Sequence, residues 1–249
     1  MDAVVNTLFF IDEKYNIRKQ MIFAVCFPLF TILALGIDSV YFNDHYFDGR
    51  QITNLLVVFY YSFFFWFSDS YLRKLMFVMV FLSYIGELIF CPLLGMYNYR
   101  TEAIPLYVPF GHAVVYASGY VFAHTEWAVK NDTQLRKYFA AGFAVLFLLV
   151  GIFLKDVFTL ILGTLFFWVL KRKKWQNLYC FVAICVIFIE LTGTFFQCWK
   201  WVPKIFGFIP VANPPMGAVF VYAGGDVLLS KIVDYWKRKQ QVSNIEILK

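Results

Sequence analysis

Charged residues are scarce in this chain. Asp, Glu, Lys and Arg make up 15% of its 249 residues, whereas about a quarter is usual in soluble domains. Hydrophobic residues make up 61% and aromatic residues 22%, and apolar runs long enough to cross a hydrocarbon core of about 30 Å recur throughout. No stretch remains that can form a sizeable water-soluble domain. The composition therefore predicts a multi-pass integral membrane protein whose main partner is the lipid bilayer.

Histidine and cysteine are also sparse, which excludes several kinds of chemistry. Three histidines are too few for the histidine clusters of a membrane di-iron enzyme. The five cysteines form no C-x-x-C pair, so neither a zinc site nor a disulfide framework is indicated. Asp44, His45 and Asp48 are better explained as a solvated loop than as a metal site. The sequence also lacks a P-loop, a dinucleotide fingerprint and a G-x-S-x-G motif, so we expect no metal and no cofactor.

The basic residues indicate orientation and not a nucleic-acid partner. The net charge is +6, but the 22 Lys and Arg lie in short clusters between apolar runs. Alternate connections between these runs, together with the two ends of the chain, hold 17 of the 22. By the positive-inside rule both termini are expected in the cytoplasm, with an even number of spans. In a bacterium the protein would lie in the plasma or inner membrane.

Turn and charge signals divide the apolar sequence into eight predicted transmembrane helices. They cover residues 20–42, 52–70, 74–98, 104–125, 136–154, 156–171, 174–198 and 208–230. Only Lys155 and Asp156 separate the fifth and sixth, which predicts a tight hairpin or, as the alternative, one interrupted helix. The predicted fold class is an all-α polytopic membrane protein.

The two halves of the chain repeat one pattern. Residues 109–119, PFGHAVVYASG, and 215–225, PMGAVFVYAGG, are identical at six of eleven positions. Upstream, Glu87-Leu88 matches Glu190-Leu191 at a similar offset. We interpret this as a parallel duplication of a four-helix unit, with residues 1–129 and 130–249 as its copies. Such copies are related by a pseudo-twofold axis along the membrane normal.

Glu87 and Glu190 are the sharpest functional candidates. Each is expected past the middle of the hydrocarbon, toward the outer side, and a charged side chain there costs at least roughly 2.5 to 3.5 kcal/mol. The two carboxyl groups should therefore face the bundle and be paired or protonated. Matched positions in both copies favour a catalytic role, and the alternative is a structural hydrogen bond to a neighbouring helix.

His112 is the histidine inside a predicted span away from its ends, which makes it the candidate acid, base or relay beside Glu87. A packed histidine is the alternative. The aromatic pairs that follow the two glutamates are typical of an interfacial belt, or else form a lid over a cavity. The candidate substrate-binding residues are Tyr97, Tyr99, Tyr116, Trp199, Trp201, Asn213 and Tyr222.

Five glycines in the predicted fourth and eighth helices permit close helix contact or the approach of a ligand to the backbone, and close packing is the commoner reason. They are Gly111, Gly119, Gly217, Gly224 and Gly225. Asp226 is expected deeper toward the cytoplasm, as a separate polar contact.

The segment from Glu190, ELTGTFFQCWKWVPKIFGFIP, resembles the E-x-x-G, aromatic-x-aromatic, F-G-x-x-P pattern of integral membrane carotenoid-biosynthesis proteins of the carotenoid 1,2-hydratase type. A looser version, ELIFCPLLGMYNYRTEAIPLYVP, begins at Glu87, and the likeness covers about 30 residues in each half. It implies acid-catalysed addition of water to an isoprenoid double bond, with Glu190 and Glu87 at the positions of the proton donor. The segment Asn213-Pro214-Pro215 departs from the family's more uniform apolar stretch.

Three functions remain open from the sequence. The first is a membrane-embedded enzyme, hydratase-like (a lyase) or isomerase-like, that transfers a proton to an apolar lipid or isoprenoid. The second is a small transporter or channel with a glutamate-lined cavity between the repeats. The third is a non-catalytic subunit of a membrane assembly. The oligomeric state is not predicted.

Overall fold

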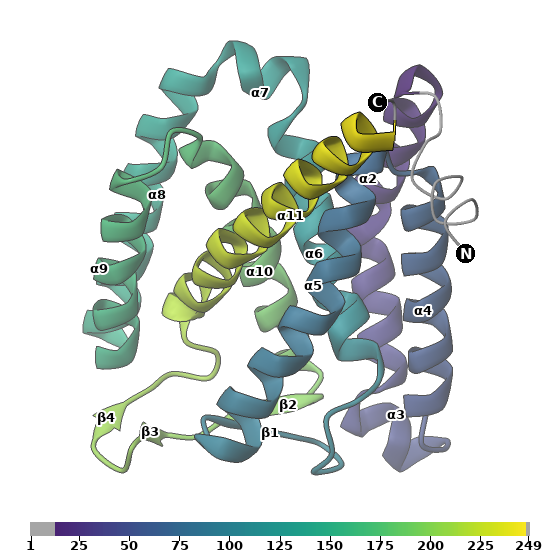
Figure 1. Cartoon of the computed structure of the whole chain (residues 1–249). Helices are drawn as coiled ribbons and strands as arrows, with labels where there is room; N and C mark the ends of the chain where they lie inside the picture. The colour runs from purple at the N-terminus through teal and green to yellow at the C-terminus, as the bar shows by residue number, and fades with distance from the viewer. Residues whose placement is uncertain (1–12, 248–249) are drawn as a thin grey trace.

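The protein is a bundle of helices with a small patch of strands at one end (Figure 1). The computed structural model describes the backbone of residues 13–247 and the side chains of residues 18–239. Within that range, the helices of 15 residues or more are α2 (Glu13–Ile37), α4 (Arg50–Phe67), α5 (Ser70–Leu88), α6 (Tyr107–Ala123), α8 (Asp132–Phe153), α9 (Val157–Lys171), α10 (Gln176–Phe195) and α11 (Val219–Ile247). The shorter elements are α3 (Val40–His45), α7 (Glu126–Lys130), a π-helical turn η1 (Ile89–Leu93) and a 3-10 turn η2 (Met216–Ala218).

Five helical segments of the described chain are long and apolar enough to cross a membrane. They are Arg18–Ile37, Ser70–Leu93, Asp132–Phe153, Gln176–Phe195 and Met216–Lys239. Large apolar side chains such as Leu29, Phe153 and Phe195 are more than 70% exposed on the outside of the bundle, where lipid tails would solvate them. The predicted class, a helical membrane protein, is confirmed.

Two short antiparallel ribbons close one end of the bundle. Strand β1 (Tyr97–Tyr99) pairs with β2 (Trp199–Trp201), and β3 (Lys204–Ile205) pairs with β4 (Ile209–Pro210). The beginning of α2 and the end of α11 lie at the opposite end (Figure 1). The β1–β2 ribbon joins segments that are about a hundred residues apart in the sequence, so it ties the two halves of the chain together.

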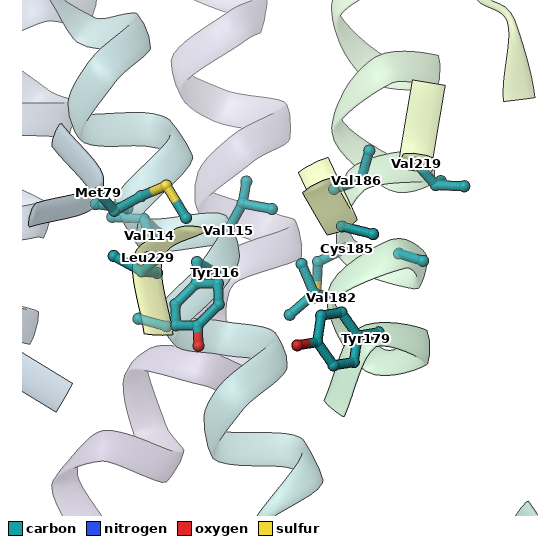
Figure 2. Packing of buried hydrophobic residues seen from close by; sticks show 14 of the residues in the cluster. Met79, Val114, Val115, Tyr116, Tyr179, Val182, Cys185, Val186, Val219 and Leu229 are labelled. Carbon is teal, nitrogen blue, oxygen red and sulfur yellow. The ribbon is translucent and has the colours of Figure 1, made fainter. Parts of the chain in front are cut away.

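Helix α6 is the centre of the bundle. It packs against α2, α4, α5 and α10, and most of its positions are buried, as expected for a helix that is apolar on every side. Gly119 permits its closest contact, because a Cβ atom there would lie 2.6 Å from the Cα atom of Val182 on α10. Figure 2 shows the core around this contact, with side chains from α5, α6, α10 and α11.

The tight hairpin between the predicted fifth and sixth helices is confirmed. Helix α8 ends at Phe153 and α9 begins at Val157. Asp156 caps α9, because its carboxylate accepts hydrogen bonds from the backbone N–H and the hydroxyl of Thr159 at 2.8 and 2.6 Å.

Several predicted helix boundaries are wrong. The predicted helix 20–42 is α2, which starts at Glu13 and ends at Ile37, and the predicted helix 208–230 continues to Ile247. The predicted helix 74–98 ends early: α5 stops at Leu88, a π-helical turn containing Pro92 follows, and Gly95 has a φ of +59°. The predicted helix 208–230 starts late, at Val219, because prolines 210, 214 and 215 cannot donate backbone hydrogen bonds. The repeated motif is therefore helical throughout in its first copy but starts in a 3-10 turn in its second.

The Gly119 contact generates a stability prediction. Gly119→Ala forces the backbones of α6 and α10 apart, which is expected to cost about 1–3 kcal/mol of unfolding free energy and to lower the thermal midpoint in detergent. Gly142→Ala on α8 is the matched control, since a Cβ atom there meets nothing within 4 Å. Equal midpoints for the two variants would contradict the close approach.

Candidate functional site

Glu87 lies in the last turn of α5 and is 5% exposed. Its Oε2 atom accepts hydrogen bonds from the hydroxyls of Tyr97 and Tyr99, both at 2.7 Å. The turn at Gly95 reverses the chain after α5 and brings β1 back over the carboxylate. Burial, followed by the charge of Glu87, raises the pKa of both tyrosines. Both phenols therefore stay protonated and act as donors.

Glu190 occupies the corresponding place on α10 and is 6% exposed. Its Oε2 atom accepts hydrogen bonds from the indole N–H groups of Trp199 and Trp201, at 3.0 and 3.1 Å. Its Oε1 atom accepts one from the hydroxyl of Tyr222 on α11, at 3.3 Å. Gly193 makes room for Trp199, because a Cβ atom there would lie 1.9 Å from the indole ring.

The β1–β2 ribbon brings the two glutamate clusters together. Its register pairs Tyr97 with Trp201 and Tyr99 with Trp199, and the first pair of rings has centroids 4.8 Å apart. All four side chains are at most 8% exposed. An interfacial belt is therefore wrong for these residues, which cover the two carboxylates from inside the protein.

His112 links the two clusters. Its Nε2 atom lies 3.0 Å from Oε1 of Glu87, and its ring stacks on that of Tyr222, with centroids 4.9 Å apart and planes 13° from parallel. Tyr222 in turn donates to Glu190. The sequence pointed to His112 and Glu87 as partners, and the structure brings them into contact.

The hydrogen bonds restrict where each carboxyl group can carry a proton. An indole N–H can only donate, so both bonds at Oε2 of Glu190 use that atom as an acceptor. The protonated tyrosines use Oε2 of Glu87 in the same way. A proton on Glu87 or on Glu190 must therefore reside on its Oε1 atom. Oε1 of Glu87 faces His112, and Oε1 of Glu190 faces Tyr222.

The two carboxylates line one cavity of about 570 Å³. Most of its wall is apolar, from α2, α5, α6, α9, α10 and α11. The candidates that line it are Glu87, Tyr97, Tyr99, His112, Glu190, Trp199, Trp201 and Tyr222. The size suits a small apolar ligand or one end of a longer one.

Two sequence candidates lie outside this cavity. Tyr116 is buried in the core, where the hydroxyl of Tyr179 points toward it (Figure 2). Asn213 is exposed, and its Oδ1 atom accepts a hydrogen bond from the backbone N–H of Trp201 at 3.0 Å. Asn213 therefore holds β2 in position and does not contact the cavity.

The glycines divide into two groups that the sequence did not separate. Gly119 and Gly217 pack tightly against neighbouring helices. Gly111, Gly224 and Gly225 line the cavity, and a Cβ atom at any of them would meet nothing within 4 Å. In the matching segments 109–119 and 215–225, tight Gly119 corresponds to open Gly225 and open Gly111 to tight Gly217, so the glycines at matching positions pack differently.

Asp226 also lines the cavity, although it was expected to be a separate contact. It is 3% exposed, and both of its carboxyl oxygens lack a hydrogen-bond partner among the described residues. No role in the cavity was predicted for Asp226 from the sequence. Its position one helical turn after Tyr222, on the same face of the helix, is the signal that could have indicated one.

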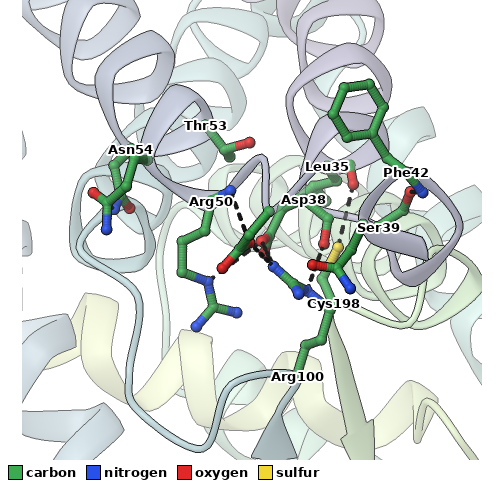
Figure 3. A network of polar contacts seen from close by, with 12 residues as sticks. Leu35, Asp38, Ser39, Phe42, Arg50, Thr53, Asn54, Arg100 and Cys198 are labelled. Carbon is green, nitrogen blue, oxygen red and sulfur yellow. Dashed lines mark hydrogen bonds and ion pairs between the residues drawn. The ribbon is translucent and has the colours of Figure 1, made fainter. Parts of the chain in front are cut away.

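A buried ionic network anchors the ribbon (Figure 3). Arg100 follows β1 directly, and its guanidinium donates to the backbone carbonyl of Asp38 at 3.0 Å and to the Asp38 carboxylate at 2.8 Å. Arg50 and the hydroxyl of Tyr107 donate to the same carboxylate. Arg100 also pairs with Asp48. Asp44, His45 and Asp48 are all exposed, as predicted for a solvated segment, although Asp44 and His45 lie at the end of α3 and not in a loop.

These features define a class: a helical membrane protein with two buried glutamates facing one apolar cavity. Comparison of the chain with protein-family models, with curated proteins and with solved structures finds no match. The function must therefore be inferred from the site.

The unpaired carboxyl of Asp226 generates a second stability prediction. Asp226→Leu has nearly the same shape and removes two buried oxygens without partners, so it is expected to stabilise the fold by about 1–3 kcal/mol and to raise the thermal midpoint. Asp156→Leu is the contrast, because it removes a carboxylate that has two hydrogen bonds, and should lower the midpoint. A lower midpoint for Asp226→Leu would contradict the absence of a partner.

Proposed function

We propose that the protein is a membrane-embedded enzyme that adds a proton to a carbon–carbon double bond of an apolar lipid or isoprenoid. One observation carries this: two buried glutamates from separate helices present Oε1 atoms, beside a histidine and a tyrosine, to one apolar cavity. A general acid of this kind needs a held proton and a substrate brought within hydrogen-bond reach of it.

Glu190 is the proposed acid. Its donors are neutral indoles and a neutral phenol, and no Lys or Arg side chain among the described residues contacts it, so the neutral acid form avoids a buried charge. Glu87 has His112 at hydrogen-bond distance. A neutral imidazole can accept one proton, and an adjacent carboxylate stabilises the imidazolium that forms, so the pair is the proposed base.

The proposed reaction can take two forms, hydration and isomerisation. The proton on Oε1 of Glu190 adds to one alkene carbon and leaves a carbocation on the other. In hydration, water adds to the cation and loses a proton to the His112–Glu87 pair. In isomerisation, the cation loses a proton from a neighbouring carbon to the same pair. In both, return of one proton from the His112–Glu87 pair to Glu190 completes the cycle.

The resemblance to carotenoid 1,2-hydratase proteins supports an isoprenoid substrate, and it rests on the segments that contain Glu87 and Glu190. We also propose the finer architecture on which this site depends: eight spans, a duplicated four-helix unit (1–129 and 130–249), and both termini in the cytoplasm. The antiparallel register of β1 and β2 supports the duplication. Asn98 lies opposite Lys200, its matched position, while Tyr97 lies opposite Trp201 and Tyr99 opposite Trp199, as a twofold axis through the centre of the ribbon would place them.

Deuterium incorporation tests the proposal. The protein in lipid vesicles is incubated in D₂O with a panel of acyclic isoprenoid polyenes, and mass spectrometry measures deuterium in C–H bonds, which both reaction forms introduce. Glu190→Gln is expected to lower the rate by about 10²- to 10⁴-fold, the usual contribution of a general acid.

Glu126→Gln is the matched control, since Glu126 is exposed on α7 outside the cavity; it should keep the full rate. An unchanged rate in the double variant Glu87→Gln, Glu190→Gln would refute the catalytic role of both acids. Absence of any deuterium uptake, together with altered proton-coupled uptake by vesicles of that double variant, would favour the transporter instead.

A further inference from the structure

Some residues that line the cavity are also exposed on the outside of the bundle. Ile85 on α5 is 55% exposed, Ile89 at the start of η1 is 39% exposed, and Leu228 on α11 is 47% exposed. Gly224 is exposed as well. These side chains belong to the cavity wall and to the outer surface at once, so they mark its rim. In Figure 1, α11 runs obliquely in front of the bundle beside α5.

The rim consists of apolar side chains and glycines. Ile85 near the end of α5 and Ile89 at the start of η1 stand one turn apart, with Gly86 between them. On α11, Gly225 and Leu228 lie on one face. A Cβ atom at Gly224 or Gly225 would meet nothing within 4 Å. Both helices belong to segments long and apolar enough to cross a membrane. The opening therefore faces hydrocarbon and not water.

The lining contains no anchor for an anionic headgroup. Among the described residues that line the cavity, none is a lysine or an arginine. A phosphate inside would stand against three carboxyl groups, Glu87, Glu190 and Asp226, without a cation of Lys or Arg. An uncharged hydrocarbon chain meets no such penalty.

We propose that the gap between α5 and α11 is a lateral portal through which an uncharged hydrocarbon chain enters end-first from the bilayer. This deepens the proposed function and rests on it for the chemistry, because it makes the substrate a bilayer-resident chain without a charged group at its entering end. Once inside, the chain end lies beside His112 and Tyr222, which are only partly buried and line the same cavity.

Photolabelling tests the portal without turnover. The full-length protein is placed in phosphatidylcholine vesicles that contain a diazirine-bearing hydrocarbon, the bilayer is illuminated, and labelled residues are mapped by mass spectrometry. The wild type should be labelled at Phe158 and Leu162, which are buried and line the cavity, as well as at exposed Leu148 and Ile152 on α8.

Gly225→Phe places a ring in the rim and should abolish labelling of Phe158 and Leu162, while Leu148 and Ile152 keep theirs. Gly142→Phe is the matched control on α8, where a Cβ atom also meets nothing within 4 Å; it should leave cavity labelling intact. Wild-type labelling confined to α8, or cavity labelling that survives Gly225→Phe in the folded variant, would overturn the portal.

Repeating the labelling with Glu190→Gln separates the two proposals. Labelled cavity residues in a variant without deuterium chemistry are expected if both proposals hold, because access does not depend on the acid. A wild type whose cavity is labelled but which deuterates no polyene would overturn the enzyme and keep the portal. A wild type that deuterates polyenes with an unlabelled cavity would overturn the portal alone.

Discussion

The rest of the structure depends on keeping two carboxyl groups inside a bundle surrounded by hydrocarbon. Each of them needs hydrogen-bond donors that water cannot supply there. Tyr97 and Tyr99 supply them to Glu87, and Trp199 and Trp201 supply them to Glu190. For these side chains to reach the acids, α5 and α10 must stop short of the bundle's end and the chain must turn back.

The ribbon that results needs its own support. A two-stranded pairing of three residues is not stable alone, so it is held at its edges by Arg100 on Asp38, by Asn213 on the backbone of Trp201, and by the rings that stack across it. The buried ions near Asp38 are thus explained by the position of the ribbon. The ionic network thus connects the ribbon that covers the glutamates to the end of α2 and the start of α4.

The two buried glutamates receive their hydrogen bonds from different kinds of side chain. Phenols and an imidazole surround Glu87, whereas indoles and a phenol surround Glu190. Indoles cannot accept a proton or become charged here, while an imidazole can. The two carboxyl groups therefore have different surroundings within one cavity. The glycines differ as well, since Gly119 and Gly217 pack tightly whereas Gly111 and Gly225 face open space.

The sequence by itself determined the helical membrane class, most helix positions, the α8–α9 hairpin, and the choice of Glu87, Glu190 and His112, because hydropathy, turn residues and a charge inside an apolar run are local signals. It did not determine the register of β1 on β2, which turned an expected belt into a buried cover. It also misjudged Asn213, Tyr116 and Asp226, whose sequence positions resemble those of cavity residues. Which side of a helix meets a cavity, a core or lipid depends on how neighbouring helices cross, and only the tertiary structure decided that.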